Sequence, residues 1–279
     1  MNMKRELAVG TAEAALLTEL ERTEIPVLSL PRHRLLLSGF DNATLRRTIH
    51  QLAAKGWLQR IEAGKYVVVP RAARQGWQEH PFIIAAAISP VPYYISYWSA
   101  LSHHNLTEQL PRGVFVAVAG GRKPALCFQG WSYRFTHRNQ RSFYGFHEPE
   151  MIGLNGAARI DVAVADPEKA ILDSLDDQAL AGGFSEIVKA IQRGFADGIL
   201  TMDRLIEYAL RYPNKAVVAR LGYILARSAI PGAGALQHGV RRNGYPPRLS
   251  TALTADEAPR DHHWNVLINV PDQLFEWMG

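Results

Sequence analysis

The amino-acid sequence predicts an α+β protein, with a small N-terminal unit of helices and a hairpin followed by a larger mixed α/β domain. Three observations carry this prediction. An amphipathic helix followed by two short strands lies between Asp41 and Pro70. The excess positive charge falls before residue 76. Strand-like runs change to helical runs near Asp166, so the larger domain is predicted to place its sheet first and its helices after it.

The helix after Asp41 is the most informative element. Asp41 or Asn42 can cap its N-terminus, because a side-chain oxygen there accepts an unpaired backbone N–H. Leu45, Ile49 and Leu52 recur at i, i+4 and i+7, which predicts one apolar stripe facing a core. At 100° per residue the opposite face and its flanks are polar. That face carries Ala43, Arg47, His50 and Gln51, and its flanks carry Thr44 and Arg46.

The flanking segments complete a three-helix unit with a hairpin. Thr11–Arg22 is predicted to be the first helix, and a second short helix is predicted over Pro31–Leu37. Gly56 ends the third helix, and strands Trp57–Ile61 and Lys65–Val69 follow it. This order is typical of a winged helix-turn-helix domain over residues 1–75. The predicted DNA-contacting residues are Arg32, Arg34, Thr44, Arg46, Arg47, His50, Gln51, Arg60 and Lys65. The alternative is a small unit whose arginines only keep its surface soluble.

Charge distribution favours nucleic acid as the partner of the N-terminal unit. The chain has 279 residues and a formal net charge of +5. Residues 1–75 hold 12 Lys and Arg against 7 Asp and Glu, which accounts for the whole excess. The remaining residues hold 19 of each sign. A basic module attached to a neutral domain is the pattern expected of a phosphate-binding reader.

Composition narrows the other possibilities. A single cysteine, Cys127, excludes an intramolecular disulfide and favours a small core residue in a strand over 125–129. The sequence lacks a signal-like apolar segment and an apolar run long enough to span a bilayer. We therefore expect a soluble cytoplasmic protein without a membrane partner. His103-His104 and His262-His263 lack metal-binding helix spacing, so neither a metal nor a cofactor is expected.

The larger domain is predicted to span 76–279. Its predicted strands are Tyr93–Ser96, Val114–Ala119, Ala125–Gln129, Tyr133–His137, Phe143–His147, Ile160–Ala165 and His263–Val270. Its predicted helices are Phe82–Ile88, Tyr97–His104, a helix capped by Asp166 and running to Leu175, Ser185–Phe195, Met202–Tyr212 and Lys215–Ser228.

Four stretches in order, GKYVVVP, YISYWSALSHHNL, GVFVAVAG and DPEKAILDSL, resemble the AbiEi family, covering the chain to about Ser228. The family comprises antitoxins and transcriptional regulators of type IV toxin–antitoxin systems that act in abortive infection. The resemblance implies a repressor that binds inverted repeats in double-stranded DNA at its own operon. It also implies an antitoxin that counters a co-encoded nucleotidyltransferase-like toxin without needing a stable complex with it. It transfers no catalytic residue, so we do not expect an enzyme.

Two weaker hypotheses remain. Asp161, Asp166, Glu168 and Lys169 invite comparison with a metal-dependent nuclease tethered to DNA, but adjacent Glu and Lys would point to opposite faces of a strand. Capping of a helix by Asp166, with Pro167 at its first position, explains that segment better. A secondary basic patch is the other hypothesis, against ordinary solvated loops. Its candidate residues are Arg122, Lys123, Arg241 and Arg242.

Overall fold

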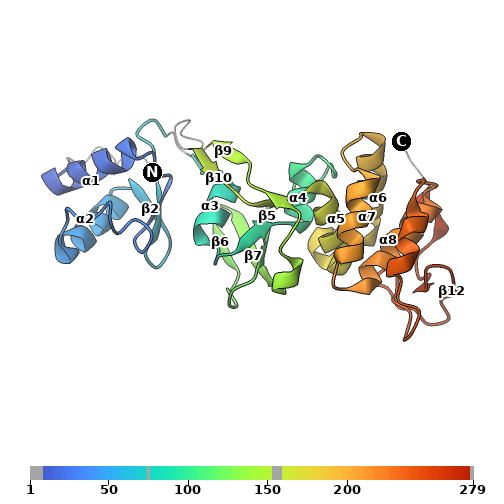
Figure 1. Ribbon diagram of the computed structural model, residues 1–279. Coiled ribbons are helices and arrows are strands. Elements are labelled where there is room, and N and C mark those ends of the chain that lie inside the picture. The colour runs from blue at the N-terminus through green and yellow to red at the C-terminus, as the bar shows by residue number, and fades with distance from the viewer. Residues whose placement is uncertain (1–8, 74–75, 153–158, 277–279) are drawn as a thin grey trace. The chain divides into compact units, whose positions relative to one another are not determined.

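The structure, a computed structural model, describes residues 9–73, 76–152 and 159–276. It divides into two compact units. Unit 1 comprises Met1–Ser89, Cys127–Trp131 and Glu148–Val162, and unit 2 comprises Pro90–Leu126, Ser132–His147 and Ala163–Gly279. The domain boundary expected near residue 76 therefore lies within unit 1. The chain has a mixed α and β structure, as the sequence predicts (Figure 1).

The first part of unit 1 alternates helices with a small antiparallel sheet. Its elements are α1 (Thr11–Arg22), β1 (Val27–Ser29), α2 (Asn42–Ala54), β2 (Leu58–Glu62) and β3 (Lys65–Val68). The strand order is β1-β3-β2, with Val27 opposite Val67 and Leu58 opposite Val68. The hairpin β2–β3 turns at Ala63-Gly64, where Gly64 has a φ of 73° that favours glycine. Strand β1 was not predicted from the sequence.

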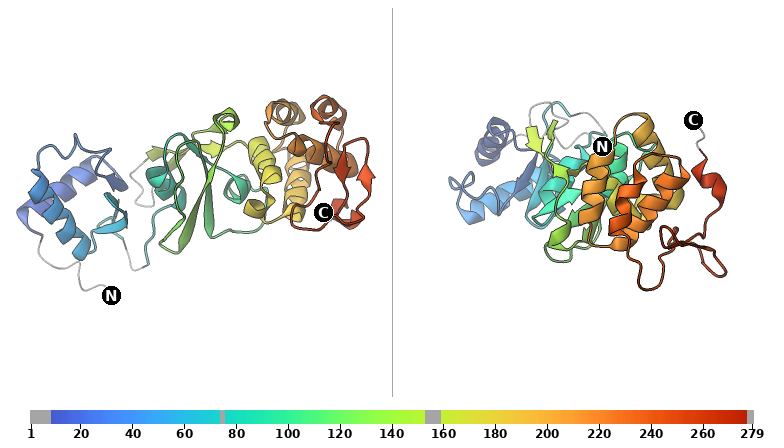
Figure 2. Two further views of the ribbon diagram at one scale, coloured as in Figure 1. Left: turned by 90° about the horizontal axis from the view of Figure 1, so that it is seen from below. Right: turned by 45° about the vertical axis from the view of Figure 1, so that its right-hand side comes forward.

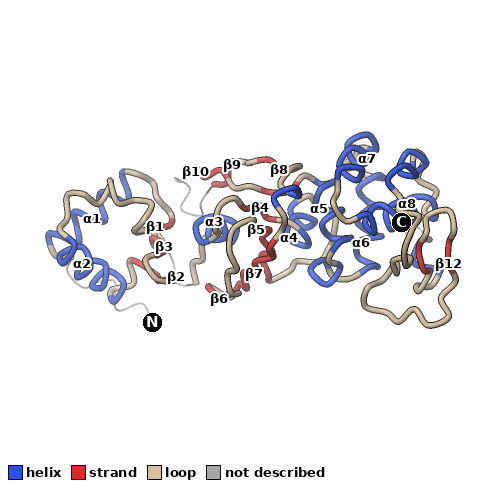
Figure 3. The backbone as a smooth tube through the Cα atoms, turned by 60° about the horizontal axis from the view of Figure 1, so that its bottom comes forward, coloured by secondary structure: helices blue, strands red, loops and turns tan. Residues whose placement is uncertain are grey.

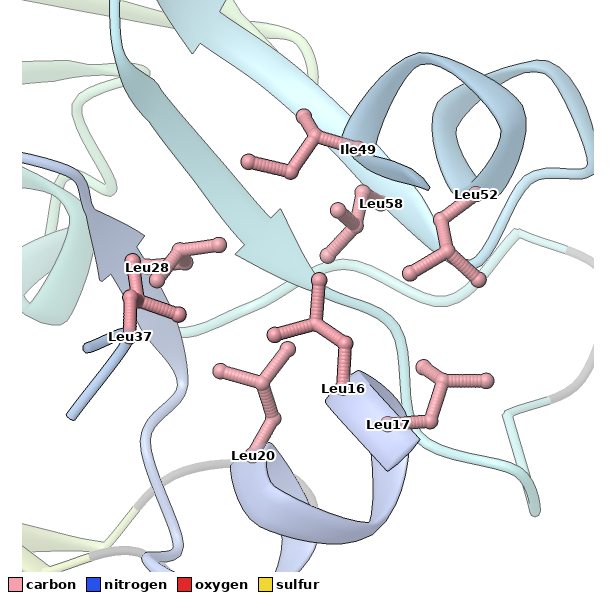
Figure 4. Close-up of a cluster of buried hydrophobic side chains, with 8 residues drawn as sticks. All are labelled: Leu16, Leu17, Leu20, Leu28, Leu37, Ile49, Leu52 and Leu58. Carbon is pink, nitrogen blue, oxygen red and sulfur yellow. The ribbon is translucent and has the colours of Figure 1, made fainter. Parts of the chain in front are cut away.

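Aliphatic side chains from every one of these elements but β3 form one core (Figure 4). It consists of Leu16, Leu17, Leu20, Leu28, Leu37, Ile49, Leu52 and Leu58. Ile49 and Leu52 are buried as the stripe predicts, whereas Leu45 is only partly buried against the cluster. Thr48 is also buried, at 2% exposure. The apolar stripe therefore fixes the rotation of α2 about its own axis.

The second helix predicted over Pro31–Leu37 is wrong. The structure has hydrogen-bonded turns there, and Figure 3 draws the connection between β1 and α2 as loop. The His33 N–H donates to the Ser29 carbonyl at 2.8 Å, and the Leu37 N–H donates to the His33 carbonyl at 3.1 Å. The His33 ring accepts from the Ser29 N–H at 3.1 Å, so this side chain holds the segment to β1. Isolated turns form because the segment is too short to propagate a helix.

An ion pair joins α1 to the end of α2. Lys55 Nζ lies 2.5 Å from Glu13 Oε2, and that oxygen also accepts from the Gly10 N–H at 2.7 Å. Burial alone would raise the pKa of Glu13, but the hydrogen bonds from Lys55 and Gly10 outweigh it and lower the pKa. Glu13 is 3% exposed, so the pair is shielded from solvent.

Acid should therefore weaken unit 1 through Glu13. A carboxyl whose pKa is lowered on folding stabilises the folded state above its unfolded value of 4.5, and this contribution is lost as the pH falls through the folded value. We expect wild type to lose more stability than Glu13→Gln between about pH 6 and about pH 3.5, because the variant cannot titrate there. Urea unfolding at both pH values measures this, and equal losses would contradict it.

The rest of unit 1 includes α3 (Pro81–Ile88) and a two-stranded antiparallel sheet of β9 (Glu150–Ile152) and β10 (Arg159–Asp161). Helix α3 begins at Pro81, and the His80 ring accepts from the Phe82 N–H at 3.2 Å. The predicted strand over Ile160–Ala165 is divided: its first residues belong to β10, and Val164–Ala165 form a separate strand, β11.

Unit 2 is built on a mixed sheet in the order β7-β5-β4-β11-β8. Its strands are β4 (Tyr93–Ile95), β5 (Gly113–Val118), β7 (Trp131–His137), β8 (Phe146–His147) and β11 (Val164–Ala165). All six residues of β5 are buried, which fits a central strand. Strand β6 (Leu126–Phe128) alternates partly buried and exposed residues, so Cys127 is exposed and its expected core position is wrong.

Besides its sheet, unit 2 consists mainly of helices (Figure 2). They are α4 (Tyr97–His103), α5 (Pro167–Asp176), α6 (Phe184–Ala196), α7 (Met202–Arg211) and α8 (Lys215–Arg227), with 3-10 turns η1 (Gln140–Ser142), η2 (Gln178–Ala181), η3 (Ala233–Gly239) and η4 (Asp272–Phe275). Helix α5 contacts the other four and lies at their centre. Two-residue strands β12 (Arg260–Asp261) and β13 (Val266–Leu267) form a hairpin in the tail. The strand predicted over His263–Val270 is mostly absent, because Asn265 has a φ of 53° that interrupts extended backbone.

Candidate nucleic-acid interface

The N-terminus of α2 is capped by Asp41 rather than Asn42, a choice that the sequence left open. Asp41 Oδ1 accepts from the Ala43 N–H at 3.0 Å and from the Thr44 N–H at 2.9 Å. Hydrogen bonds from Thr44, and then from the backbone, lower the pKa of Asp41. The carboxylate therefore satisfies two of the free N–H groups at the helix start.

The exposed face of α2 carries the residues that the helical phase predicts. Arg46, Arg47, His50 and Gln51 are exposed, and Thr44 is half-buried. In the part of the chain that the structure describes, neither arginine forms an ion pair, so both guanidinium groups face solvent. Successive residues are turned by about 100° around a helix, so the two arginines point in different directions along one face.

Arg32 and Arg34 lie on the turns between β1 and α2 rather than on a helix. Both are exposed, and neither makes an ion pair with the described residues. His33 between them is half-buried, and burial, with the Arg32 charge adding to it, lowers the pKa of His33. The neighbouring Leu35 is 89% exposed. The turns thus present two cations and an apolar side chain to solvent.

The β2–β3 hairpin carries the last two predicted DNA-contacting residues, Arg60 and Lys65, and their charges have different surroundings. Arg60 is exposed, and its Nε approaches the Glu62 carbonyl at 3.5 Å. Lys65 Nζ lies 3.0 Å from Glu62 Oε1, so its charge is already paired. The Gly64 carbonyl at the hairpin turn accepts from the Leu30 N–H at 2.9 Å, which ties the hairpin to the turns. Arg60 is therefore better placed than Lys65 to meet a phosphate.

The four residues of the predicted secondary patch have different surroundings in unit 2. Arg122 is exposed after β5, and Lys123 lies over the Phe135 ring at 5.4 Å. Arg241 and Arg242 are exposed after η3. Arg242 donates to the His262 carbonyl at 3.0 Å and to Gln237 Oε1 at 2.5 Å, so it is fixed to the tail.

Unit 2 also contains a buried ion pair that the sequence analysis missed. Lys169 and Asp173 on α5 are both 0% exposed and are hydrogen-bonded to each other. The Lys169 ammonium donates to the Tyr94 hydroxyl at 2.8 Å and lies 4.9 Å from that ring's centroid. Burial lowers the pKa of Lys169, and the Asp173 charge opposes this.

The carboxylates of α5 complete this network with groups from other elements. Asp173 accepts from the Ser96 hydroxyl at 2.7 Å and from the Tyr212 hydroxyl at 2.9 Å. Asp176 accepts from Arg138 Nη1 at 2.5 Å. Together these hydrogen bonds tie α5 to β4, to the residue after β7 and to the residue after α7. We assign this network a structural role, because the side chains satisfy one another.

The segment proposed for a nuclease is used differently. Asp166 occupies the N-cap position of α5 but its side chain makes no capping bond. It accepts instead from the Tyr208 hydroxyl at 2.8 Å and lies 2.9 Å from His147 Nδ1. Glu168 is 1% exposed and accepts from the Thr201 N–H at 2.9 Å. Asp161 lies on β10 in unit 1. Among the described residues, no three His, Cys, Asp or Glu side chains are arranged to hold a metal ion.

Comparisons with known proteins inform the fold. The crystal structure of the RV2827C protein from Mycobacterium tuberculosis superposes with a TM-score of 0.61 at 16% identity, covering 94% of this chain and 93% of that one. At this identity the likeness establishes a shared fold over nearly the whole length. No protein-family model and no curated protein matches the sequence. Within the described ranges, the helices are too short or too polar for a membrane span.

Proposed function

We propose that the chain is a DNA-binding transcriptional repressor that reads double-stranded DNA through a winged helix-turn-helix domain in unit 1. The observation that carries this is the arrangement around α2. A helix fixed by Ile49 and Leu52 presents Arg46 and Arg47 to solvent, and neither arginine forms an ion pair with a residue that the structure describes. The sheet order β1-β3-β2 and the hairpin after α2 support this proposal, because a winged helix has such a hairpin after its recognition helix; turns take the place of its middle helix here. In that fold, the helix enters the major groove and the hairpin approaches the backbone.

Electrostatics support this assignment. The whole formal net charge of +5 falls in residues 1–75, and exposed arginines on the turns, the helix and the hairpin belong to this segment. Each phosphate neutralised by a cation releases counterions, so such a surface binds DNA with a steep salt dependence. The remaining 204 residues are neutral overall, which leaves them suited to other partners.

The proposal extends to an antitoxin function for the larger domain. The resemblance to the AbiEi family supports this part. It also supports two further parts of the proposal, an operator of inverted repeats and a nucleotidyltransferase-like toxin as functional partner. In this proposal the chain acts in the cytoplasm, is not itself an enzyme and counters the toxin without a stable complex. The mutual satisfaction of Lys169 and Asp173 supports a non-catalytic reading of the α5 segment.

Two double variants of the full chain test the DNA-binding surface. Arg46→Ala with Arg47→Ala removes two exposed cations of α2 that have no ion-pair partner among the described residues. Arg22→Ala with Arg71→Ala removes two cations already paired with Glu19 and Glu21. We expect the first pair to weaken binding to DNA from upstream of the gene by roughly tenfold or more, since one bidentate base contact alone contributes about 1–3 kcal/mol. We expect the second pair to change binding by less than about threefold, since surface ion pairs contribute little.

Electrophoretic mobility shifts at several salt concentrations give the comparison. The α2 variant should also lower the slope of log K against log salt by about one, because we expect only Arg46 of the two arginines to neutralise a phosphate. Equal effects of the two double variants would assign binding to overall charge and remove α2 from the interface.

A further inference from the structure

The surface around Tyr245 in unit 2 has the features of a binding site for nucleotides. Tyr245 is 85% exposed, in the segment Arg241–Arg248 with sequence RRNGYPPR. Single exposed aromatic residues are ordinary on protein surfaces. Tyr245 is different because it lines two adjoining hollows, of about 260 and about 500 Å³.

Both hollows are lined by cations. Lys215 and Arg241 line the smaller one, and Arg220 and Arg248 line the larger one. The smaller hollow has no acidic lining residue among those the structure describes, and Asp256 is the acid of the larger one. The surface beside the exposed ring is therefore positive, although unit 2 belongs to the part of the chain without net charge.

Arg220 is a buried, hydrogen-bonded side chain in the wall of the larger hollow. It is 7% exposed, and burial lowers its pKa. Its Nε donates to the Arg248 carbonyl at 2.8 Å and its Nη1 donates to the Leu175 carbonyl at 2.9 Å. These bonds fix the guanidinium in the wall of the hollow, and no acceptor from the described residues engages its Nη2. A buried guanidinium whose Nη2 has no acceptor among the described residues favours an anionic ligand.

The smaller hollow adds groups that can meet a base. Asn243 is exposed on its rim, and its amide makes no hydrogen bond to the residues that the structure describes. An amide both donates and accepts, as the edge of a base requires. In the sequence Tyr245 follows Gly244, whose φ is 100°, and precedes two prolines, which restrict the backbone that carries the ring.

We propose that this surface, the Tyr245 site, binds nucleotides of a single-stranded nucleic acid, with a base stacked on Tyr245 and phosphates held by the flanking arginines. An exposed aromatic ring between cations is how proteins bind single strands, because every base has a face that stacks. A duplex hides those faces, so the site differs in ligand from the α2 surface. The inference does not depend on the proposed repressor function.

The test uses the full chain carrying Arg46→Ala and Arg47→Ala, so that α2 contributes little. Fluorescence anisotropy of a labelled uridine oligonucleotide measures its Kd. Tyr245→Ala should weaken binding roughly 5- to 150-fold, which corresponds to about 1–3 kcal/mol per stacked base. Tyr245→Phe should keep affinity within about twofold, because its ring still stacks. Leu253→Ala is the control, since Leu253 is also exposed on the tail and lines neither hollow.

Competition distinguishes the sources of the ligand. Unlabelled oligonucleotide that displaces the probe better than uridine monophosphate supports a strand, and equal displacement per nucleotide supports a free nucleotide at the same site. Poly-glutamate that competes as well as the oligonucleotide would overturn the proposal in favour of an acidic protein surface. Wild-type affinity in Tyr245→Ala, or no measurable binding before mutation, would also overturn it.

Discussion

Replacing Lys169 with methionine should destabilise unit 2 by about 3–5 kcal/mol, which is the cost of leaving one partner of a buried ion pair alone. Asp173 would keep its bonds from Ser96 and Tyr212, but its charge would lose its only direct cation in α5. The methionine fills similar volume, so the loss reports charge rather than a cavity. Urea unfolding of the full chain, followed by circular dichroism, measures the change.

A matched control and a double variant make this prediction specific. Lys189→Met removes a 61%-exposed lysine on α6 that pairs with Glu186 at 3.5 Å, and it should change stability by less than about 0.5 kcal/mol. Lys169→Met combined with Asp173→Leu should cost less than the sum of the single variants, with a coupling of about 0.5–3 kcal/mol. Strict additivity of the two would mean that the amine and the carboxylate do not stabilise each other.

The Lys169–Asp173 pair could not be predicted from the sequence because α5 is buried. Lys169 and Asp173 stand at i and i+4, a spacing that normally marks a solvated surface pair. Yet Glu168 through Leu175 are all buried. Helix α5 therefore has no solvent-exposed face, and the periodicity of its sequence does not show which side chains are buried. Its partners Tyr94 and Tyr212 lie far away in the chain, and a single sequence carries no signal for that proximity. The apolar residues Ala170, Ile171 and Leu172 between the lysine and the aspartate were the available hint.

The N-terminal unit was easier to predict because its helices are amphipathic. The start of α1, its end, the cap of α2 and the buried stripe of Ile49 and Leu52 all follow local rules. Strand β1 was missed because three residues carry too little pattern, and its pairing with β3 decides its structure. The same pairing brings His33 against the Ser29 N–H, so the predicted helix over Pro31–Leu37 gave way to turns.

Of the nine predicted DNA contacts, Lys65 illustrates what local reasoning leaves out. The sequence places it at the start of the second strand of the hairpin, where a phosphate contact is reasonable. Its ion pair with Glu62 depends on the turn that brings the two side chains together. Arg60 on the opposite strand keeps its charge unpaired within the described residues and is the better candidate.

Alanine at Arg47 should remove discrimination between operator and random DNA, whereas alanine at Arg46 should weaken both kinds of binding together. The buried positions of Ile49 and Leu52 set the helix phase and place Arg47 near the centre of the exposed face, in the second turn after the Asp41 cap. An arginine there can pair with guanine O6 and N7, which contributes about 1–3 kcal/mol of discrimination. Arg46, turned by about 100°, should reach a phosphate instead.

The two variants are therefore expected to lose different properties of DNA binding, specificity for Arg47→Ala and overall affinity for Arg46→Ala. Arg47→Ala should reduce the ratio of operator to random affinity by about one to two orders of magnitude. Arg46→Ala should leave that ratio nearly unchanged and lower the salt slope by about one on both DNAs. Titrations of each variant against both DNAs at three salt concentrations separate these effects. If Arg47→Ala weakens operator binding and random binding equally, Arg47 contacts the DNA backbone. The base contacts would then come from His50 and Gln51, which are exposed on the same side of α2, or from the exposed turns that precede α2.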